Sequence, residues 1–194
     1  MATTTKPRPR RAAERRSSRR ERRERTRTEV IGAALELAEG APFRDLTVDQ
    51  IAKTAGLSRS AFYTHFHDKH ELLLAAVEEV AEELYEMADR WWHGEGPPAE
   101  RVWDAIEGVV KVYADQANLL RIATEVSTYD EEVREVWIAI AERFIEATAA
   151  HIRSEQGADL IPESLRARPT AEALVWMVER CCYIYLGRGE RGPR

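Results

Sequence analysis

Two short helical patterns, separated by a tight turn and followed at once by the start of a longer helix, occupy residues 47–72. Thr47 is a good N-cap for the first pattern, and Gln50, three residues later, completes a capping box. Gly56 ends that pattern, because a residue without a Cβ tolerates the left-handed backbone of a helix C-cap. The stretch therefore predicts two helices joined by a glycine turn.

The second of these helices combines a buried side with a polar side. We predict that it spans Arg59–Phe66, with Ser58 as its cap, and that Phe62 and Phe66 face inward because they lie four positions apart. The residues on or near its outer side are Arg59, Ser60, Tyr63, Thr64 and His65. Helix, glycine turn and helix form the helix-turn-helix arrangement, in which the second helix enters the major groove of DNA.

The same stretch resembles the DNA-binding signature of the tetracycline-repressor (TetR) family of bacterial regulators. The resemblance is free of gaps and rests on Thr47-Val48, Ile51-Ala52, Ala55-Gly56-Leu57-Ser58, Phe62-Tyr63, His65-Phe66 and Lys69-x-Glu71-Leu72. The alternative is an ordinary helical hairpin with a buried aromatic pair. Such a hairpin has no need for an outward set of arginine, serine, tyrosine, threonine and histidine.

The resemblance implies which residues contact DNA. The full set of candidates is Thr47, Arg59, Ser60, Ala61, Tyr63, Thr64, His65 and Lys69. Arg59, Ser60 and Thr64 are the candidate base readers, and an arginine on guanine is the strongest such contact. Family positions that hold phosphates match Thr47, Tyr63, His65 and Lys69, and Lys69 is aided by the positive end of the next helix. Tyr63 could instead pack against the core, and His65 could cap a helix end.

Charge is distributed unevenly along the chain. Residues 1–27 hold twelve basic and three acidic residues, a formal charge of +9, so the remainder carries −14 within the net charge of −5. An acidic body would repel a phosphate backbone, and any DNA contact must therefore come from the basic end. We expect residues 1–21 to form a disordered basic arm that lies along phosphates or enters a minor groove, unless it is only a solvated tail.

Apolar spacing beyond the arm is helical throughout and predicts an all-α protein. Residues 22–68 are expected to form a three-helix DNA-binding head with the helix-turn-helix. A fourth helix of about 24 residues, or roughly 36 Å, would join the head to an antiparallel helical body. The regulatory domain, for ligand binding and dimerisation, would then span residues 69–194.

Bulky aromatic residues recur at helical spacing in the body, where a TetR-family regulator holds its inducer pocket. The candidate ligand-binding residues are Trp103, Tyr113, Trp137, Ala141, Phe144 and Trp176. The aromatic set, the stretch at 136–152 and the MVER sequence at 177–180 are similar to the subgroup of the mycobacterial repressor of ethionamide activation. Aromatic stripes of this kind also occur in ordinary cores. Few charges face the expected cavity, which favours an apolar or amphipathic effector.

A homodimer through the eighth helix is expected, because the pattern at 174–185 is apolar around nearly its whole circumference. Family members usually add a ninth helix to this interface, whereas here a polar, glycine-rich sequence follows the eighth. The alternative function is consequently a shortened, non-dimerising ligand-binding or interaction protein that retains the DNA-binding head.

The sequence lacks the signals of several other classes of protein. It has no apolar run long enough for a membrane span and no apolar signal core, which predicts a cytoplasmic protein without membrane contact. No phosphate loop, metalloprotease motif or nucleophile elbow is present, so we expect neither an enzyme nor a cofactor or metal site. The predicted function is a DNA-binding transcriptional repressor. It would bind a palindromic operator and leave it when an effector tilts the fourth helix.

Overall fold

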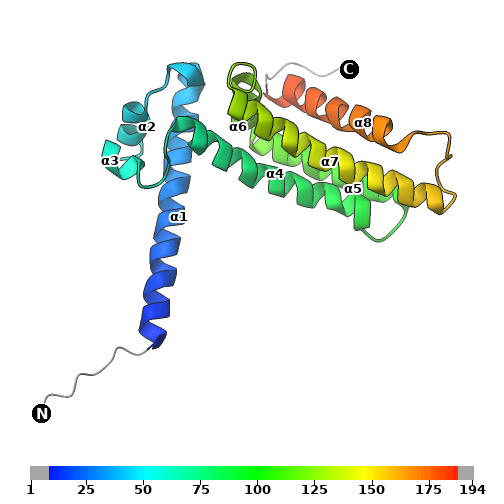
Figure 1. Ribbon diagram of the computed structural model, residues 1–194, viewed down its shortest axis with the longest axis horizontal. Coiled ribbons are helices and arrows are strands. Elements are labelled where there is room, and N and C mark those ends of the chain that lie inside the picture. The colour runs from blue at the N-terminus through cyan, green and yellow to red at the C-terminus, as the bar shows by residue number, and fades with distance from the viewer. Residues whose placement is uncertain (1–8, 188–194) are drawn as a thin grey trace, which may run out of the picture. The chain divides into compact units, whose positions relative to one another are not determined.

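The computed structural model describes residues 9–187, except for the side chains of residues 9–16 and Pro98. The described part of the chain is helical, without strands, as the sequence predicts. Its elements are α1 (Pro9–Gly40), the 3₁₀ turn η1 (Phe43–Asp45), α2 (Val48–Thr54), α3 (Arg59–Phe62), α4 (Lys69–His93), α5 (Pro98–Asp115), α6 (Ala117–Val126), α7 (Glu131–Gly157), α8 (Ala167–Cys182) and the π-helical turn η2 (Tyr183–Gly187) (Figure 1). The chain divides between Leu72 and Leu73 into two compact units, here termed the head and the body.

The head is built around a small aromatic and aliphatic core. Its fully buried side chains come from every helix of the unit: Val30 and Ala34 of α1, Ile51 and Ala52 of α2, Phe62 of α3, Phe66, and Leu72 at the start of α4. The rings of Phe62 and Phe66 lie 5.9 Å apart. The inward pair predicted from the sequence is therefore confirmed, and it holds the second helix of the helix-turn-helix against the other two.

Capping at both ends of α2 fixes the turn as the sequence predicts. Thr47 and Gln50 form the capping box, with the Thr47 N–H donating to Gln50 Oε1 at 2.8 Å. At the other end Gly56 has φ +68°, and the Leu57 N–H donates to the Ala52 carbonyl at 2.8 Å. This Schellman arrangement needs a left-handed residue, and glycine adopts that conformation without steric cost.

Two predictions for the head are wrong. The second helix ends at Phe62 rather than Phe66, and turns with short-range hydrogen bonds, such as His65 N–H to the Phe62 carbonyl at 2.8 Å, carry the chain onward. Residues 9–21, predicted to be disordered, belong to α1, while residues 1–8 of the predicted arm lie outside the described residues. Arginine, alanine and glutamate are good helix formers, and the Ser17 hydroxyl donates to Glu21 Oε1 one turn later at 2.7 Å, which supports the helix without any apolar stripe.

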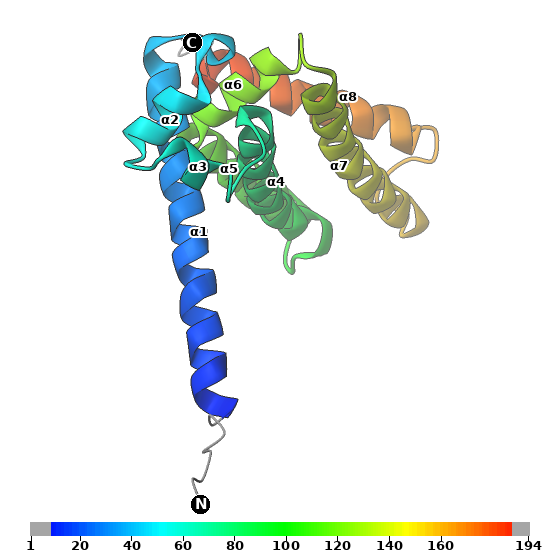
Figure 2. The ribbon, with the colours of Figure 1, turned by 60° about the vertical axis from the view of Figure 1, so that its left-hand side comes forward.

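The body consists of α4 from Leu73 onward together with α5 to α8 and η2. Helix α8 runs back along α7, which is seen from two directions in Figures 1 and 2. Ile145, Ala149 and Ile152 of α7 and Ala171 of α8 form a buried cluster where the two helices meet. One side of α8 stays open to solvent, with Met177 54% exposed. Within the described residues, no helix combines the length and the apolar character that crossing a bilayer requires.

Candidate functional site

The head presents a polar surface around α3. Arg59, Ser60, Tyr63 and Thr64 are exposed there, while Ala61 and His65 are half-buried. Thr47 is exposed at the start of α2, the neighbouring helix of the motif. Together these seven residues are termed the reading surface. Seven of the eight predicted DNA-binding residues thus keep exposed or half-buried side chains in the helix-turn-helix and the turn after it, whereas Lys69 lies at the start of α4.

Arg59 is held across the reading surface by two neighbours. Its Nη1 lies 3.0 Å from Asp49 Oδ2, and its Nη2 donates to the Tyr63 hydroxyl at 3.4 Å. The bond to Tyr63 and the charge of Asp49 raise the pKa of Arg59, so the guanidinium keeps its charge at any physiological pH. Ion pairs between exposed side chains contribute little to stability. Arg59 is therefore available to exchange Asp49 for a base edge or a phosphate.

The hydroxyl groups of the motif are tied to the backbone and to each other. Ser58 caps α3 by accepting the Ala61 N–H at 3.2 Å, and its Oγ lies 3.0 Å from Ser60 Oγ. The Thr64 hydroxyl donates to the Ala61 carbonyl at 2.7 Å. These bonds orient exposed hydroxyls that still have lone pairs free for further hydrogen bonds.

His65 is held by α1. Arg27 Nη1 donates to the His65 carbonyl at 2.7 Å, and the Arg27 guanidinium lies 4.2 Å from the centre of the Phe66 ring. Burial lowers the pKa of His65, and the charges of Arg23 and Arg27 lower it further. The imidazole is consequently neutral at neutral pH. Its Nδ1 is buried and makes no hydrogen bond within the described residues.

Lys69 has a structural role in the head. Its ammonium donates to the carbonyls of Phe43, Arg44 and Leu46 at 3.0, 2.7 and 2.8 Å. A lysine has three donors, and all three are used here to tie the loop before α2 to the start of α4. Burial lowers the pKa of Lys69, against the opposing charges of Asp45 and Asp68. The predicted phosphate contact through the Lys69 side chain would require breaking this clasp.

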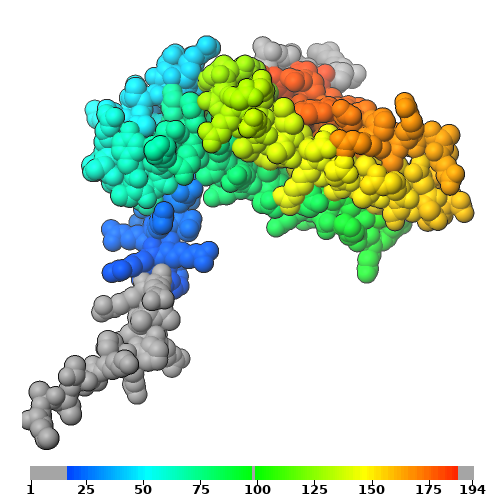
Figure 3. Space-filling model, viewed as in Figure 1, coloured from blue at the N-terminus to red at the C-terminus, as the bar shows by residue number. Residues whose placement is uncertain are grey.

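Helix α1 adds a basic surface to the head. Its residues 17–25 are all exposed and include Arg19, Arg20, Arg22, Arg23 and Arg25. Figure 3 shows this part of α1 standing clear of the rest of the head. An arginine-rich helix of this kind is suited to phosphate contacts along a duplex and carries no sequence information of its own.

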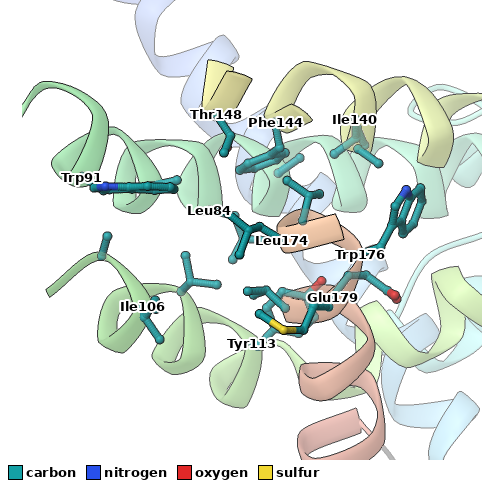
Figure 4. A pocket seen from close by; sticks show the side chains of 18 of the residues that line it. Leu84, Trp91, Ile106, Tyr113, Ile140, Phe144, Thr148, Leu174, Trp176 and Glu179 are labelled. Atoms are coloured by element: carbon teal, nitrogen blue, oxygen red, sulfur yellow. The ribbon is translucent and has the colours of Figure 1, made fainter. Parts of the chain in front are cut away.

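A cavity of about 300 Å³ lies within the body (Figure 4). Its walls come from α4, α5, α7 and α8, with one residue from α6, and they are almost entirely apolar. Among the lining residues are Leu84, Trp91, Trp92, Ile106, Tyr113, Trp137, Ala141, Phe144, Thr148, Leu174, Trp176 and Glu179. A cavity of this size and character suits a small, mainly apolar molecule.

Five of the six predicted ligand-binding residues line this cavity: Tyr113, Trp137, Ala141, Phe144 and Trp176. Trp103 does not, and its predicted place on an inner face is wrong, because it is 70% exposed. Its neighbour Val102 lines the cavity instead. Adjacent residues on a helix point about 100° apart, so the inner face of α5 follows Val102, Ala105 and Val109, and Trp103 points outward.

Two groups of lining residues were missed by sequence reasoning. Trp91 and the other α4 residues that line the cavity are absent from the six predicted ligand-binding residues. Glu179 was not singled out, although Glu179 and Arg180 are two adjacent charged residues within the otherwise apolar run at 174–186, which was a visible signal. Glu179 is nevertheless buried and is the sole charged side chain among the lining residues that the structure describes.

Two family models cover most of the chain. Residues 30–76 match the model of bacterial regulatory proteins of the tetR family, and residues 102–191 match the C-terminal domain of the transcriptional regulator EthR. The first match contains the reading surface and Lys69. The second contains α5 from Val102 onward and α6 to α8, and hence most of the cavity wall.

Two EthR proteins are similar to this chain over most of its length. The HTH-type transcriptional regulator EthR of Mycolicibacterium smegmatis is 30% identical over 156 residues, which cover 78% of this chain and 70% of that protein. The EthR sequence of Mycobacterium tuberculosis strain H37Rv is also 30% identical, over 79% of this chain and 72% of that protein.

Solved structures share the fold. NalD of Pseudomonas aeruginosa, the secondary repressor of a multidrug efflux pump, superposes with a TM-score of 0.69 at 24% identity, over 84% of this chain and 86% of that one. The regulator FadR of Bacillus subtilis, solved with stearoyl-CoA, gives a TM-score of 0.71 at 17% identity, over 85% of this chain and 89% of that one.

Proposed function

Since this chain belongs to the TetR family of transcriptional regulators, with an EthR-type C-terminal domain, we propose that it represses transcription by occupying an operator and leaves that operator when a small molecule fills the body cavity. The observation that carries the proposal is the course of α4. This helix begins at Lys69 in the head and continues to Trp91 and Trp92 in the cavity wall. A ligand that moves α4 therefore acts on an element that is covalently and helically continuous with the head.

In the proposed complex α3 enters the major groove. Arg59 leaves Asp49 to read a base, preferably guanine, while Ser60 of the same helix and Thr64 of the turn that follows it supply further base contacts. Tyr63, Thr47 and His65 hold phosphates with hydroxyl or imidazole donors, and Ala61 packs close to the DNA between them. Because the Lys69 ammonium is used within the head, its phosphate contact falls to its main-chain N–H at the positive end of α4.

We propose that two chains act together on a palindromic operator, with α8 as the main contact between them. The open side of α8, including the exposed Met177, supports this assignment. Helix α5, which also contacts α8, adds an exposed apolar row at Trp103, Ile106 and Val110. Exposed apolar residues that gather across neighbouring helices are typical of protein contact surfaces.

Ligand release is tested with a neutral fluorescent probe, N-phenylnaphthylamine. We expect one probe molecule to bind per chain and to weaken operator binding by about 5- to 150-fold, the usual range of allosteric coupling. Ala141→Phe, which places a ring into the cavity, should abolish probe binding. Trp103→Ala is the matched control, since it removes an aromatic side chain outside the cavity and should leave probe affinity unchanged. Fluorescence titration and gel-shift assays measure both effects.

Two outcomes would contradict this part of the proposal. Probe binding that survives Ala141→Phe would place the ligand somewhere other than the cavity. Operator affinity that stays constant while the wild-type cavity is filled would remove the link between ligand and DNA. In that second case a DNA-binding protein that does not respond to its cavity ligand would be the better description.

The alternative, a non-dimerising ligand-binding protein that retains the head, differs in how many heads reach the DNA at once. A single head would contact one half-site and would bind weakly. We propose the repressor over this alternative because the exposed apolar row of α5 and the exposed Met177 of α8 suit a second chain. We further propose that the protein acts in the cytoplasm, where its DNA lies, and that it has no catalytic activity.

A further inference from the structure

The cavity contains one polar end. Figure 4 shows Trp91 toward one side and Glu179, Tyr113 and Trp176 toward the other. Glu179 reaches the cavity from the last turns of α8 and is only 9% exposed. Tyr113 faces it from α5 and is buried as well. The other walls near this end are apolar, so Glu179 brings an ionisable group into an environment that offers it little solvation.

The Glu179 carboxylate lacks a full partner. Its Oε2 is buried and accepts no hydrogen bond within the described residues. The nearest cation, Arg180 Nε, lies 3.8 Å from Oε2, which is beyond hydrogen-bond distance, and its side chain is 57% exposed to solvent. Buried carboxylates are normally paired or fully hydrogen-bonded, because an unpaired one has lost its hydration without compensation.

The groups around Glu179 do not offset the cost of burying its charge. Burial raises the pKa of Glu179, and Arg180 opposes this only in part. Burial also raises the pKa of Tyr113, with Glu179 adding to the effect. The pKa of Cys182 rises to about 11, chiefly through burial, then through Cys181 and Glu179. Of these groups, the neutral Tyr113 hydroxyl and the Glu179 carboxyl line this end of the cavity, and no cationic side chain lines it within the described residues.

We propose that Glu179 is the recognition group of the cavity and that the effector is an apolar molecule carrying one protonated amine. The amine donates to the unpartnered Oε2, while the apolar part lies against the aromatic walls. An ammonium–carboxylate contact inside an apolar cavity is a charge-assisted hydrogen bond, which is stronger than a neutral one. The inference rests on the proposed role of the cavity as the effector site and specifies the chemical class of the effector.

Three molecules of equal length test this selectivity: phenylbutylamine, phenylbutanol and phenylbutyrate. Each carries a phenyl group on a chain of four carbons, and they differ in a cationic, neutral or anionic end. We expect wild-type protein to bind the amine at least about tenfold more tightly than the alcohol, and the carboxylate more weakly than both. Isothermal titration calorimetry measures the affinities, and the tryptophans of the cavity provide an independent fluorescence signal.

Glu179→Gln keeps the shape of the side chain and removes its charge. We expect this variant to lose the preference for the amine and to bind the alcohol as wild type does. Glu172→Gln is the matched control, because Glu172 is an exposed carboxylate two turns earlier on α8. It should retain the preference. Since an unpaired buried charge is removed, Glu179→Gln should melt at or above the wild-type temperature at neutral pH, whereas loss of a structural ion pair would lower it.

Proton release gives a second measurement. Ionised Glu179 is the form that binds the ammonium, so any proton carried by Glu179 in the free protein passes to solvent on binding. Titrations in two buffers of different ionisation enthalpy should show a release of up to one proton per amine in the wild type and none in Glu179→Gln. Amine affinity should therefore rise with pH until Glu179 is ionised in the free protein.

The outcomes separate this inference from the proposed function. If the alcohol binds in the cavity and the wild type does not prefer the amine, the role of Glu179 is refuted while the cavity remains an effector site. A preference that persists in Glu179→Gln refutes it equally. If none of the three molecules binds, both the effector site and the role of Glu179 are refuted.

Discussion

Replacing Phe62 with alanine is expected to unfold the head while the body stays folded. Phe62 is completely buried, and its ring packs against Phe66 at 5.9 Å and edge-on against Tyr63 at 5.6 Å. Truncating a buried phenylalanine costs about 3–5 kcal/mol. A small domain has a stability of roughly the same size. The variant should lose operator binding altogether. The amides of α2 and α3 should lose their protection from hydrogen exchange.

The body supplies an internal control for this variant. Because the division between the compact units falls after Leu72, Phe62→Ala should leave probe binding in the cavity and protection of α7 unchanged. Tyr63→Phe is a matched substitution at the exposed residue that directly follows Phe62, and it should cost about 0.5 kcal/mol or less. Protection of α3 that survives Phe62→Ala would contradict the assigned core. Simultaneous loss of α7 protection would contradict the division into two units.

Replacing Arg59 with alanine is expected to remove sequence selectivity while the head remains folded. A bidentate arginine contact with guanine discriminates against a wrong base by about 1–3 kcal/mol, which corresponds to about 5- to 150-fold in operator affinity. The loss also leaves Asp49, its partner at 3.0 Å, as an unpaired negative charge near the DNA. Affinity for a scrambled duplex should fall much less, so the ratio of specific to nonspecific binding measures the effect.

Arg153→Ala controls for the lost charge, because Arg153 is an exposed arginine on α7, outside the head. It should leave both affinities close to wild type. Gel-shift assays at fixed salt concentration compare the three proteins, since phosphate contacts make every affinity salt-dependent. If Arg59→Ala retained the wild-type ratio of specific to nonspecific binding, Arg59 would be a phosphate contact or a surface residue and not the base reader.

Local rules explain why the head was largely predictable from its sequence. Thr47, Gln50, Gly56 and Ser58 each act within four positions of the chain, through caps and a left-handed turn. Such interactions leave a signature in neighbouring residues, and the inward pair Phe62 and Phe66 follows from helical spacing. The end of α3 was harder to predict. Residues 63–66 form irregular turns in place of the last predicted helical turn, and their sequence is compatible with both.

Long-range contacts explain most of what the sequence did not predict. Lys69 was assigned to a phosphate, and only the folded head shows three carbonyls from the 43–46 loop around its ammonium. Trp103 was predicted to line the cavity. Its neighbour Val102 does so instead, because adjacent residues of a helix point in different directions. The position of Glu179 in the cavity wall and its unpartnered oxygen depend on helices that are distant in sequence, so neither could be predicted from the residues around it.

The basic arm shows a different limit of sequence reasoning. Residues 9–21 lack the apolar stripe that usually marks a helix, and they were therefore predicted to be disordered. In the structure they continue α1, which is anchored in the head at Val30 and Ala34. Once a helix is nucleated by packing, good helix formers extend it without further contacts.

The central claim, that two heads of this regulator occupy one specific operator, is tested most directly by footprinting the wild-type protein on the DNA upstream of its own gene. We predict a protected palindrome whose half-sites are centred about 34–36 Å apart, one helical turn, on one face of the duplex. Protection that is uniform along the DNA, or confined to a single half-site, would contradict the claim.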